Sequence, residues 1–302
     1  MQKSTGDIIR HLLGSLYCYL RRCIFAILSV GPVPNHIAFI MDGNRRYAKK
    51  RNMKEGDGHK AGFTALMSIL RYCYELGVKY VTVYAFSIDN FKRKPKEVQT
   101  LMELMREKIE ELLQQESLIN EYGVRLHFIG DLQLLTEPVR AVVEKAMRVT
   151  AHNNQRVLLI CVAYTSRHEI VNAVQELESA GKKDGVFDHN VEKHAVDHID
   201  AEITSCTKLV EMNKARMYKQ GEVIKLVDIE KQMYMAVAPD PDIMIRTSGE
   251  ARLSNFLLWQ TSTCPLYAPT ALWPEIGLRH LVWAVLNFQR HHFYLEKKKK
   301  HF

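Results

Sequence analysis

Short apolar runs alternate with longer amphipathic stretches along most of the chain. The runs rich in Val, Ile and Tyr have the length and composition of buried strands, and they lie at residues 36–41, 79–86, 124–129, 156–163 and 242–245. Apolar residues at helical spacing fill the stretches at about 59–76, 96–121, 137–152, 166–178 and 278–295. Strands that alternate with helices predict an α/β fold, a single domain with a mostly parallel central sheet flanked by helices.

Three segments depart from this alternation. Residues 1–30 contain an apolar stretch that Arg21 and Arg22 interrupt, so a simple transmembrane helix is not indicated, and a signal-peptide cleavage site is missing. We expect an amphipathic helix associated with a membrane or a partner, the alternative being a helix packed on its own domain. Residues 179 to about 223 are polar and read as an inserted loop rather than a metal site, although they include three histidines. Residues 297–302 form a basic tail, which leaves 31–296 as the main domain.

Composition narrows the classes of partner. Hydrophobic residues make up 47% of the 302 residues, enough for a packed core. Lys and Arg outnumber Asp and Glu by 42 to 34, and a net charge of +8 favours phosphorylated metabolites, acidic lipids or nucleic acid. No aromatic-rich RRM or KH signature supports RNA binding, so we expect no nucleic-acid partner. Six cysteines without a CxxC pair fit a reducing compartment, and we expect most of them in the core.

Polar segments follow four of the predicted strands where these strands end: DGNRR at 42–46, SIDNFKR at 87–93, YTSR at 164–167 and RTSGEARLS at 246–254. Ligands of parallel sheets bind at the edge where the carboxyl ends of the strands meet. We therefore expect five arginines on one rim: Arg45, Arg46, Arg93, Arg246 and Arg252.

These residue types suit a diphosphate with a magnesium ion. Guanidinium groups pair with phosphate oxygens, and Gly43 lets the backbone approach an anion where a helix is expected to begin near Arg45. Asp42 ends a strand and is a candidate ligand of Mg²⁺, which takes few carboxylates together with phosphate oxygens and water. Taken singly, Asp42 could be a helix cap and each arginine a surface ion pair; their convergence favours the site.

Other phosphate-binding motifs are absent from the sequence. It has no GxxxxGK[ST] and no GxGxxG, which excludes the usual nucleotide-binding loops. It also has no Asp-Asp dipeptide, so the DDxxD motif of trans-prenyltransferases is missing. The residues alone thus predict a Mg²⁺-dependent enzyme that acts on diphosphates.

Several long motifs resemble one known family. They are HIAFIMDGNRRYAKK at 36–50, GHKAGF at 58–63, YAFSIDNFKR at 84–93, IGDLQLL at 129–135, IRTSGEARLSNFLLWQ at 245–260 and LWPE at 272–275. In this order, from about residue 31 to 294, they closely resemble the cis-prenyltransferases, which include undecaprenyl and dehydrodolichyl diphosphate synthases, and within them a plant rubber-transferase-like branch. The resemblance implies that residues 31–296 form a catalytic domain with an elongated hydrophobic tunnel. It also implies condensation of isopentenyl diphosphate onto an allylic primer such as farnesyl diphosphate, giving a long-chain cis-polyprenyl diphosphate of the dehydrodolichyl or rubber type.

The resemblance also assigns roles to residues. Asp42 would bind Mg²⁺ and act in catalysis with Asn90, which matches the position linked to proton removal; an amide is a poor base, so a diphosphate oxygen is an alternative acceptor that Asn90 would position. The substrate-binding positions would be Gly43, Asn44, Arg45, Arg46, Tyr47 and His59 on the allylic side, Arg246, Arg252, Leu253 and Ser254 on the isopentenyl side, and Ser87, Phe91 and Arg93 beside Asn90. The apolar stripe from Val98 to Leu112 would line the tunnel, and part of it would be ordinary core.

Departures from the family pattern suggest a partner. Glu55 stands where bacterial members carry an arginine, Pro265 falls near their acidic second metal ligand, and Asp89 replaces a glutamate. The chain has no RxG triplet, which completes the isopentenyl site in homodimeric members. The resemblance then implies a non-catalytic subunit like the Nogo-B receptor that supplies RxG, with both at the cytosolic face of the endoplasmic reticulum membrane, or else in the cytosol or on lipid particles. A rival hypothesis makes this chain the non-catalytic scaffold, but scaffolds lose the Asp and Arg of DGNRR that this chain keeps.

Overall fold

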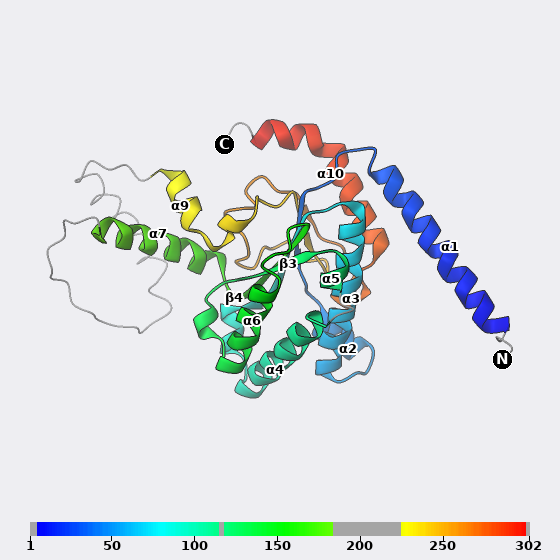
Figure 1. The fold of residues 1–302 in the computed structure, drawn as a ribbon, viewed down its shortest axis with the longest axis horizontal. Helices are drawn as coiled ribbons and strands as arrows, with labels where there is room; N and C mark the ends of the chain where they lie inside the picture. Colours follow the sequence, from blue (N-terminus) through cyan, green and yellow to red (C-terminus); the bar gives the residue numbers. More distant parts are fainter. Residues whose placement is uncertain (1–4, 115–117, 184–224, 300–302) are drawn as a thin grey trace. The chain divides into compact units, whose positions relative to one another are not determined.

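The computed structural model describes residues 5–114, 118–183 and 225–299. Within them the central sheet has six parallel strands in the order β3-β4-β2-β1-β5-β6 (Figure 1). The strands are β1 (His36–Ile40), β2 (Tyr80–Ser87), β3 (Val124–Ile129), β4 (Arg156–Tyr164), β5 (Ile243–Arg246) and β6 (Leu266–Tyr267). The predicted parallel sheet is confirmed. Only β6 was missed, because two residues after Pro265 are too short to give a strand pattern.

Helices connect the strands and cover the sheet. They are α1 (Thr5–Leu28), α2 (Asn44–Lys50), α3 (Glu55–Leu76), α4 (Pro95–Leu112), α5 (Leu118–Glu121), α6 (Glu137–Val149), α7 (Ser166–Lys183), α9 (Leu226–Gln232) and α10 (Leu278–Lys299). Short 3-10 turns are η1 (Ile88–Lys92), η2 (Leu132–Leu134), η3 (Tyr234–Val237) and η4 (Trp273–Glu275). Helix α10 packs on α3 and β5, while α5 and α6 pack on β3.

Two predicted helices end earlier than their sequence patterns suggested. The stretch at 96–121 is divided into α4 and α5, because Leu118 and Ile119 turn to bury their side chains and α5 packs on β3. Helix α6 ends at Val149, and the buried Thr150 is its C-cap: Oγ1 donates to the carbonyl of Ala146 and accepts the N–H of Leu126 at 3.0 Å. At the other end of the chain, α10 runs through 297–299, so the first half of the expected basic tail continues a helix.

The chain divides into two compact units, one formed by residues 1–166 with 238–302 and the other by residues 167–237. The first contains the whole sheet. In the second, the buried carboxylate of Glu169 accepts the N–H of Met235 at 2.8 Å, so the start of α7 meets η3. The insert expected from residue 179 begins inside α7, which is helical to Lys183, and its remainder with the three histidines lies outside the described residues.

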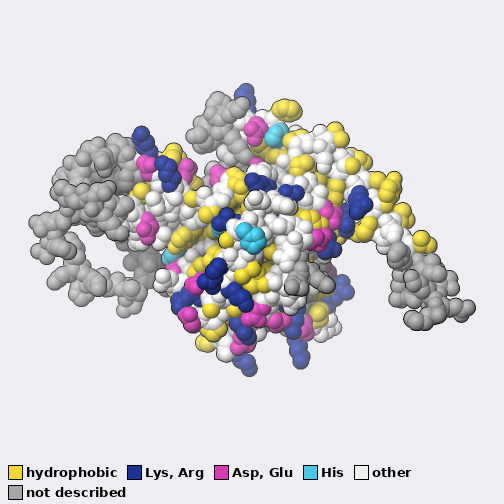
Figure 2. Space-filling model, viewed as in Figure 1, with side chains coloured by type: hydrophobic (Ala, Val, Ile, Leu, Met, Phe, Trp, Pro, Cys, Tyr) yellow, Lys and Arg dark blue, Asp and Glu magenta, His cyan; other side chains and the backbone are white. Residues whose placement is uncertain are grey.

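Helix α1 packs on the domain through part of its described length. Phe25 and Leu28 are buried, and Arg21 pairs with Glu75 of α3 at 2.8 Å. By contrast, hydrophobic side chains along the middle of α1 are exposed (Figure 2): Leu12, Leu13, Leu16, Tyr19 and Leu20. No helix among the described residues has the length and apolar character needed to cross a membrane. What the exposed part of α1 associates with stays a prediction.

The expected burial of the cysteines is only partly confirmed. Among the described ones, Cys73 and Cys161 are buried, Cys18 is exposed, and Cys23 and Cys264 are intermediate. The amphipathic α1 places two of these thiols outside the core.

Candidate active site

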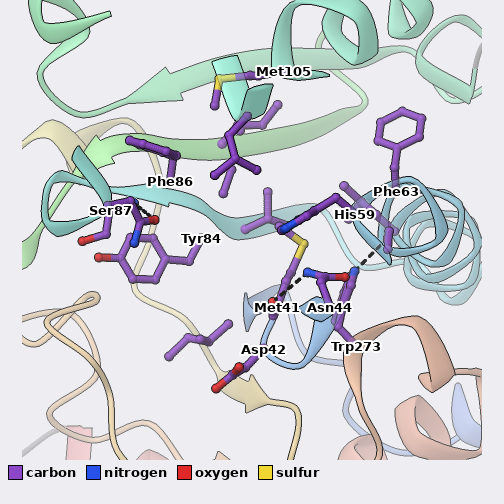
Figure 3. A pocket seen from close by; sticks show the side chains of 18 of the residues that line it. Met41, Asp42, Asn44, His59, Phe63, Tyr84, Phe86, Ser87, Met105 and Trp273 are labelled. Atoms are coloured by element: carbon purple, nitrogen blue, oxygen red, sulfur yellow. Dashed lines mark hydrogen bonds between the residues drawn. The ribbon is translucent and has the colours of Figure 1, made fainter. Parts of the chain in front are cut away.

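A cavity of about 670 Å³ begins at the carboxyl edge of the sheet and continues between α3, α4 and the strands. Its polar rim includes Asp42 after β1, Asn90 after β2 and Arg246 at the end of β5. Its interior is apolar and includes Phe63 from α3 and Met105 from α4. Figure 3 shows Asp42 at one end of the cavity and Met105 and Phe63 at the other, with His59 between them. The predicted convergence of separate loops on one edge therefore occurs.

Asp42 is held by two arginines from different elements. Its Oδ2 accepts a hydrogen bond from Arg246 Nη2 at 2.8 Å, and its Oδ1 accepts one from Arg46 Nη2 at 3.1 Å. Burial by itself would raise the pKa of this carboxyl, but the hydrogen bonds and charges of Arg246 and Arg46 outweigh burial and lower the pKa below its ordinary value. Asp42 is therefore an ionised carboxylate at neutral pH.

Arg246 organises the loop that follows β5. Its side chain is only 4% exposed, and Nη1 donates to Ser254 Oγ at 2.6 Å and to the carbonyl of Arg252. The Arg252 side chain itself is exposed and pairs with Glu250. Within the described chain, positive φ angles at non-glycine residues concentrate in this loop: Ser248, Ser254, Asn255 and Leu257. Such conformations are unfavourable for residues with a Cβ and mark a segment whose shape its surroundings impose.

Gly43 and Asn44 shape the turn into α2. Gly43 has φ of 113°, and a Cβ there would lie 3.1 Å from the backbone of Leu272, so only glycine fits. Asn44 Nδ2 donates to the carbonyl of Met41 at 3.3 Å, and its Oδ1 lies against Gly62 of α3. Tyr47 lies further along α2 and pairs with Arg51, whose guanidinium is 5.6 Å from the ring centroid.

Glu97 joins two of the predicted arginines and was missed from the sequence. Its Oε1 is 2.8 Å from Arg93 Nη1 and 3.7 Å from Arg45 Nη1. Most of the predicted site residues lie in segments that directly follow strands, whereas Glu97 lies in the first turn of α4. The spacing of four residues between Arg93 and Glu97 was the available signal.

Asn90 is fixed by its own turn. Its Oδ1 accepts the backbone N–H of Ser87 at 3.1 Å, and Ser87 Oγ accepts the N–H of Asp89 at 3.2 Å. The Asn90 side chain therefore offers its amide NH₂, a donor, to the cavity. Phe91 packs edge-on against Phe86 with ring centroids 4.9 Å apart, which is a core contact.

The predicted site residues divide into two groups. Those that line the cavity are Asp42, Asn44, His59, Ser87, Asn90, Arg93, Arg246 and Ser254. Those that lie beside it are Gly43, Arg45, Arg46, Tyr47, Phe91, Arg252 and Leu253. Two residues of the second group are connected to the rim through another side chain: Arg46 binds Asp42, and Arg45 pairs with Glu97.

The donor set fits magnesium. No cluster of three or more His, Cys, Asp or Glu side chains suited to a metal occurs in the described parts of the chain. A zinc-type site is thus not indicated there, whereas Mg²⁺ needs only one or two carboxylates when phosphate oxygens complete its shell. The ionised Asp42 beside diphosphate-binding residue types meets this requirement.

Comparison with known proteins places the chain in a family. The family model described as "Putative undecaprenyl diphosphate synthase" matches residues 40–294. The chain belongs to the cis-prenyltransferase family. It is therefore a prenyltransferase, as the motifs in the sequence indicated, and not merely an α/β protein with a basic rim.

Individual relatives of this cis-prenyltransferase are close. It is 57% identical to dehydrodolichyl diphosphate synthase 6 of Arabidopsis thaliana over 298 residues, covering 99% of this chain and 97% of the relative. It is 54% identical to the rubber cis-polyprenyltransferase HRT2 of Hevea brasiliensis, covering 94% and 93%. It is 40% identical to the dehydrodolichyl diphosphate synthase complex subunit DHDDS of Homo sapiens, covering 95% and 76%.

A solved structure confirms the fold. The crystal structure of lavandulyl diphosphate synthase from Lavandula x intermedia, in complex with dimethylallyl diphosphate, superposes with a TM-score of 0.67. It shares 26% sequence identity, and the match covers 85% of this chain and 95% of the other.

Proposed function

We propose that this cis-prenyltransferase condenses isopentenyl diphosphate onto an allylic diphosphate such as farnesyl diphosphate, giving a long-chain cis-polyprenyl diphosphate of the dehydrodolichyl or rubber type. One observation carries the proposal: a single cavity joins a rim of Asp42, Asn90 and Arg246 to an apolar interior between α3 and α4. A diphosphate with a hydrocarbon chain is the substrate class that such a cavity suits. The names of the plant relatives, a dehydrodolichyl diphosphate synthase and a rubber cis-polyprenyltransferase, support it.

Two groups of residues would bind the two diphosphates. Arg246, Ser254 and the neighbouring Arg252 and Leu253 would hold isopentenyl diphosphate, because Arg246 already gathers this loop by hydrogen bonds to Ser254 Oγ and the Arg252 carbonyl. The turn into α2 would hold the allylic diphosphate through Gly43, Asn44, Arg45, Arg46 and His59, with Tyr47 behind it. Arg93, tied to Arg45 through Glu97, would complete the rim between them.

The reaction breaks the bond between the allylic carbon and its diphosphate oxygen, and the isopentenyl double bond supplies the electron pair of the new carbon–carbon bond. The arginines stabilise the negative charge that develops on the departing diphosphate. Mg²⁺, held by Asp42, would supply a Lewis acid for the same charge. Asn90 cannot easily act as a base while its Oδ1 accepts the Ser87 N–H, so it would donate its NH₂ to a diphosphate oxygen that takes the proton.

The apolar interior would hold the growing chain. Leu101, Leu104, Met105, Ile109 and Leu112 of α4 line the cavity, whereas Met102 on the same helix is a buried core residue. A cavity of about 670 Å³ has the size of a pocket for one small ligand, so a long polyprenyl chain must extend beyond it.

Narrowing this interior should shorten the product. We expect Leu104→Trp to shift the product distribution to shorter homologues, because the larger ring blocks the path of the chain. Arg106→Trp on the exposed face of α4 is the matched control and should leave the distribution unchanged. Product lengths are measured by chromatography of products made from labelled isopentenyl diphosphate. Equal product distributions for the two variants would contradict the proposal that this cavity holds the growing chain.

Full activity would require a second subunit. The chain lacks RxG, and the human relative is named as the subunit of a complex. We propose a non-catalytic partner like the Nogo-B receptor that supplies this motif. To test this, the chain is purified alone and with such a subunit, and isopentenyl incorporation is measured. Transfer that depends on the partner supports both the function and the partner, whereas full activity of the chain alone contradicts the partner. No transfer in either case contradicts the function and favours the scaffold role.

The exposed part of α1 would attach the enzyme to a lipid surface, at the cytosolic face of the endoplasmic reticulum or on lipid particles. Its exposed apolar residues and the net charge of +8 suit an anionic bilayer. We expect the chain to float with phosphatidylcholine–phosphatidylserine vesicles, and Leu16→Asp with Leu20→Asp to lower the bound fraction several-fold. Leu134→Asp, a change at an exposed leucine elsewhere, is the control. Equal flotation of all three proteins would contradict attachment to lipid through α1 and would favour a protein partner for its exposed face.

A further inference from the structure

The last residue of β5 and the two residues that follow it are linked to Asp42, two of them directly and the third through Arg46. Arg246 binds the carboxylate itself at 2.8 Å. Thr247 Oγ1 donates to the Asp42 carbonyl at 2.6 Å and accepts the Asp42 N–H at 3.0 Å. Ser248 acts through another side chain: its Oγ accepts Arg46 Nη2 at 2.6 Å, and the same nitrogen donates to Asp42 Oδ1 at 3.1 Å. The hydroxyl of Ser248 thus links the loop after β5 to α2.

The backbone of Ser248 is held in an unfavourable conformation. Its φ is 76°, in the left-handed region where a Cβ is strained and glycine is preferred. Its N–H donates to the Ala271 carbonyl at 2.7 Å, and the N–H of Gly249 donates to the Pro269 carbonyl at 2.8 Å. Glycine would satisfy the same backbone bonds with less strain. A side chain kept at a strained position points to a role for that side chain, and Oγ is the atom with a contact.

Arg46 needs such an anchor. Its side chain is 51% exposed and is long and flexible, so one hydrogen bond to Asp42 leaves the guanidinium many orientations. A second bond from a rigid loop fixes Nη2 and thereby fixes where the remaining N–H groups point. We propose that Ser248 is a positioning residue that holds Arg46 against Asp42, so that the guanidinium is oriented for a substrate diphosphate before the substrate arrives. The proposal rests on the proposed function only in naming that diphosphate.

The test uses inorganic pyrophosphate as the probe, in magnesium-free buffer, with affinity measured by calorimetry on the full chain. Ser248→Ala keeps the Cβ and its strain and removes only the hydroxyl, and we expect pyrophosphate affinity to fall about tenfold. Ser248→Gly also lacks the hydroxyl but relieves the backbone strain. It should bind pyrophosphate as weakly as Ser248→Ala does, but it should melt at a higher temperature than Ser248→Ala. Asn52→Ala, at another non-glycine residue with positive φ, is the control and should bind like the wild type.

A double-mutant cycle separates positioning from packing. In an Arg46→Met background, Ser248→Ala should cause no further loss of affinity, because its partner is already gone. The proposal is overturned if the two losses of affinity are additive, or if Ser248→Ala binds pyrophosphate like the wild type. It is also overturned if the affinities of the two Ser248 variants follow their melting temperatures, or if the wild type binds no pyrophosphate. Pyrophosphate affinity is also independent of turnover. Suppose that pyrophosphate binding depends on Ser248 but the chain transfers no isopentenyl unit, with or without a partner. This result would contradict the proposed function and still support the positioning role of Ser248.

Discussion

Asp42→Asn is expected to abolish isopentenyl transfer while leaving the fold intact. The amide removes the negative charge that would hold Mg²⁺ and keeps an oxygen that can accept a hydrogen bond from Arg246. A loss of about 10³-fold or more in kcat/KM is reasonable for the main electrostatic group of a site. Steady-state assays with the proposed partner subunit present, together with a melting curve, measure both effects.

Asp42→Ala is the informative companion. It leaves the buried guanidinium of Arg246 without its carboxylate, and losing one partner of such a pair costs about 3 kcal/mol or more of unfolding free energy. We therefore expect alanine to be less stable than asparagine and equally inactive. Wild-type turnover in Asp42→Asn would contradict the catalytic role of Asp42 whatever the stability of either variant.

The same carboxylate makes stability depend on pH in a defined direction. The pKa of Asp42 is lowered in the folded chain from its ordinary value of 3.8, through Arg246 and Arg46 acting against burial. Its ionised form therefore stabilises the fold above the ordinary value, and this contribution is lost as the pH falls through the lower, folded-state pKa. The stability difference between wild type and Asp42→Asn should be largest near neutral pH and shrink in acid, which urea unfolding at several pH values would measure.

Much of the site could be predicted because topology, not side-chain detail, brings its parts together. Segments that follow parallel strands meet at one edge whatever their rotamers, so Asp42, Asn90 and Arg246 were expected together and line one cavity. The contacts that decide how these residues act were not accessible in the same way. Glu97 between Arg93 and Arg45, and Ser248 on Arg46, depend on which rotamers the packed structure selects.

For the fold, too, the main elements could be predicted from the sequence, whereas details that depend on packing could not. Strand pattern and helical spacing located β1 to β5 and the main helices, since both reflect burial of apolar faces. The break between α4 and α5 was missed because the apolar spacing continues across it, and only packing on β3 shows that Leu118 and Ile119 turn away. The short α2 was expected only as a start near Arg45, because seven residues carry little periodicity.

Gly62→Ala is the second change with a large expected effect, and it acts without touching a charged group. A Cβ at Gly62 would lie 2.2 Å from Asn44 Oδ1 and 3.0 Å from Trp273 Cδ1. The Gly62 carbonyl already accepts Trp273 Nε1 at 2.8 Å. Figure 3 shows the side chains of Asn44 and Trp273 close to each other. The methyl group must push Asn44 or the whole of α2 away from α3. Overpacking of this kind costs about 1–3 kcal/mol of unfolding free energy. A displacement of roughly 1 Å at the turn after Asp42 costs about 10²-fold in kcat/KM.

Gly56→Ala on the same helix provides the matched control, because nothing lies within 4 Å of its added Cβ. It should keep wild-type kinetics and raise the unfolding free energy by up to about 1 kcal/mol, since alanine favours helix more than glycine does. Combining Gly62→Ala with Asn44→Ala removes the atom that the new methyl group meets, and we expect part of the lost stability to return although activity does not. Unfolding free energies of the single and double variants measure this. If Gly62→Ala alone keeps both stability and turnover, the close approach of α2 to α3 does not hold the allylic side of the site in place.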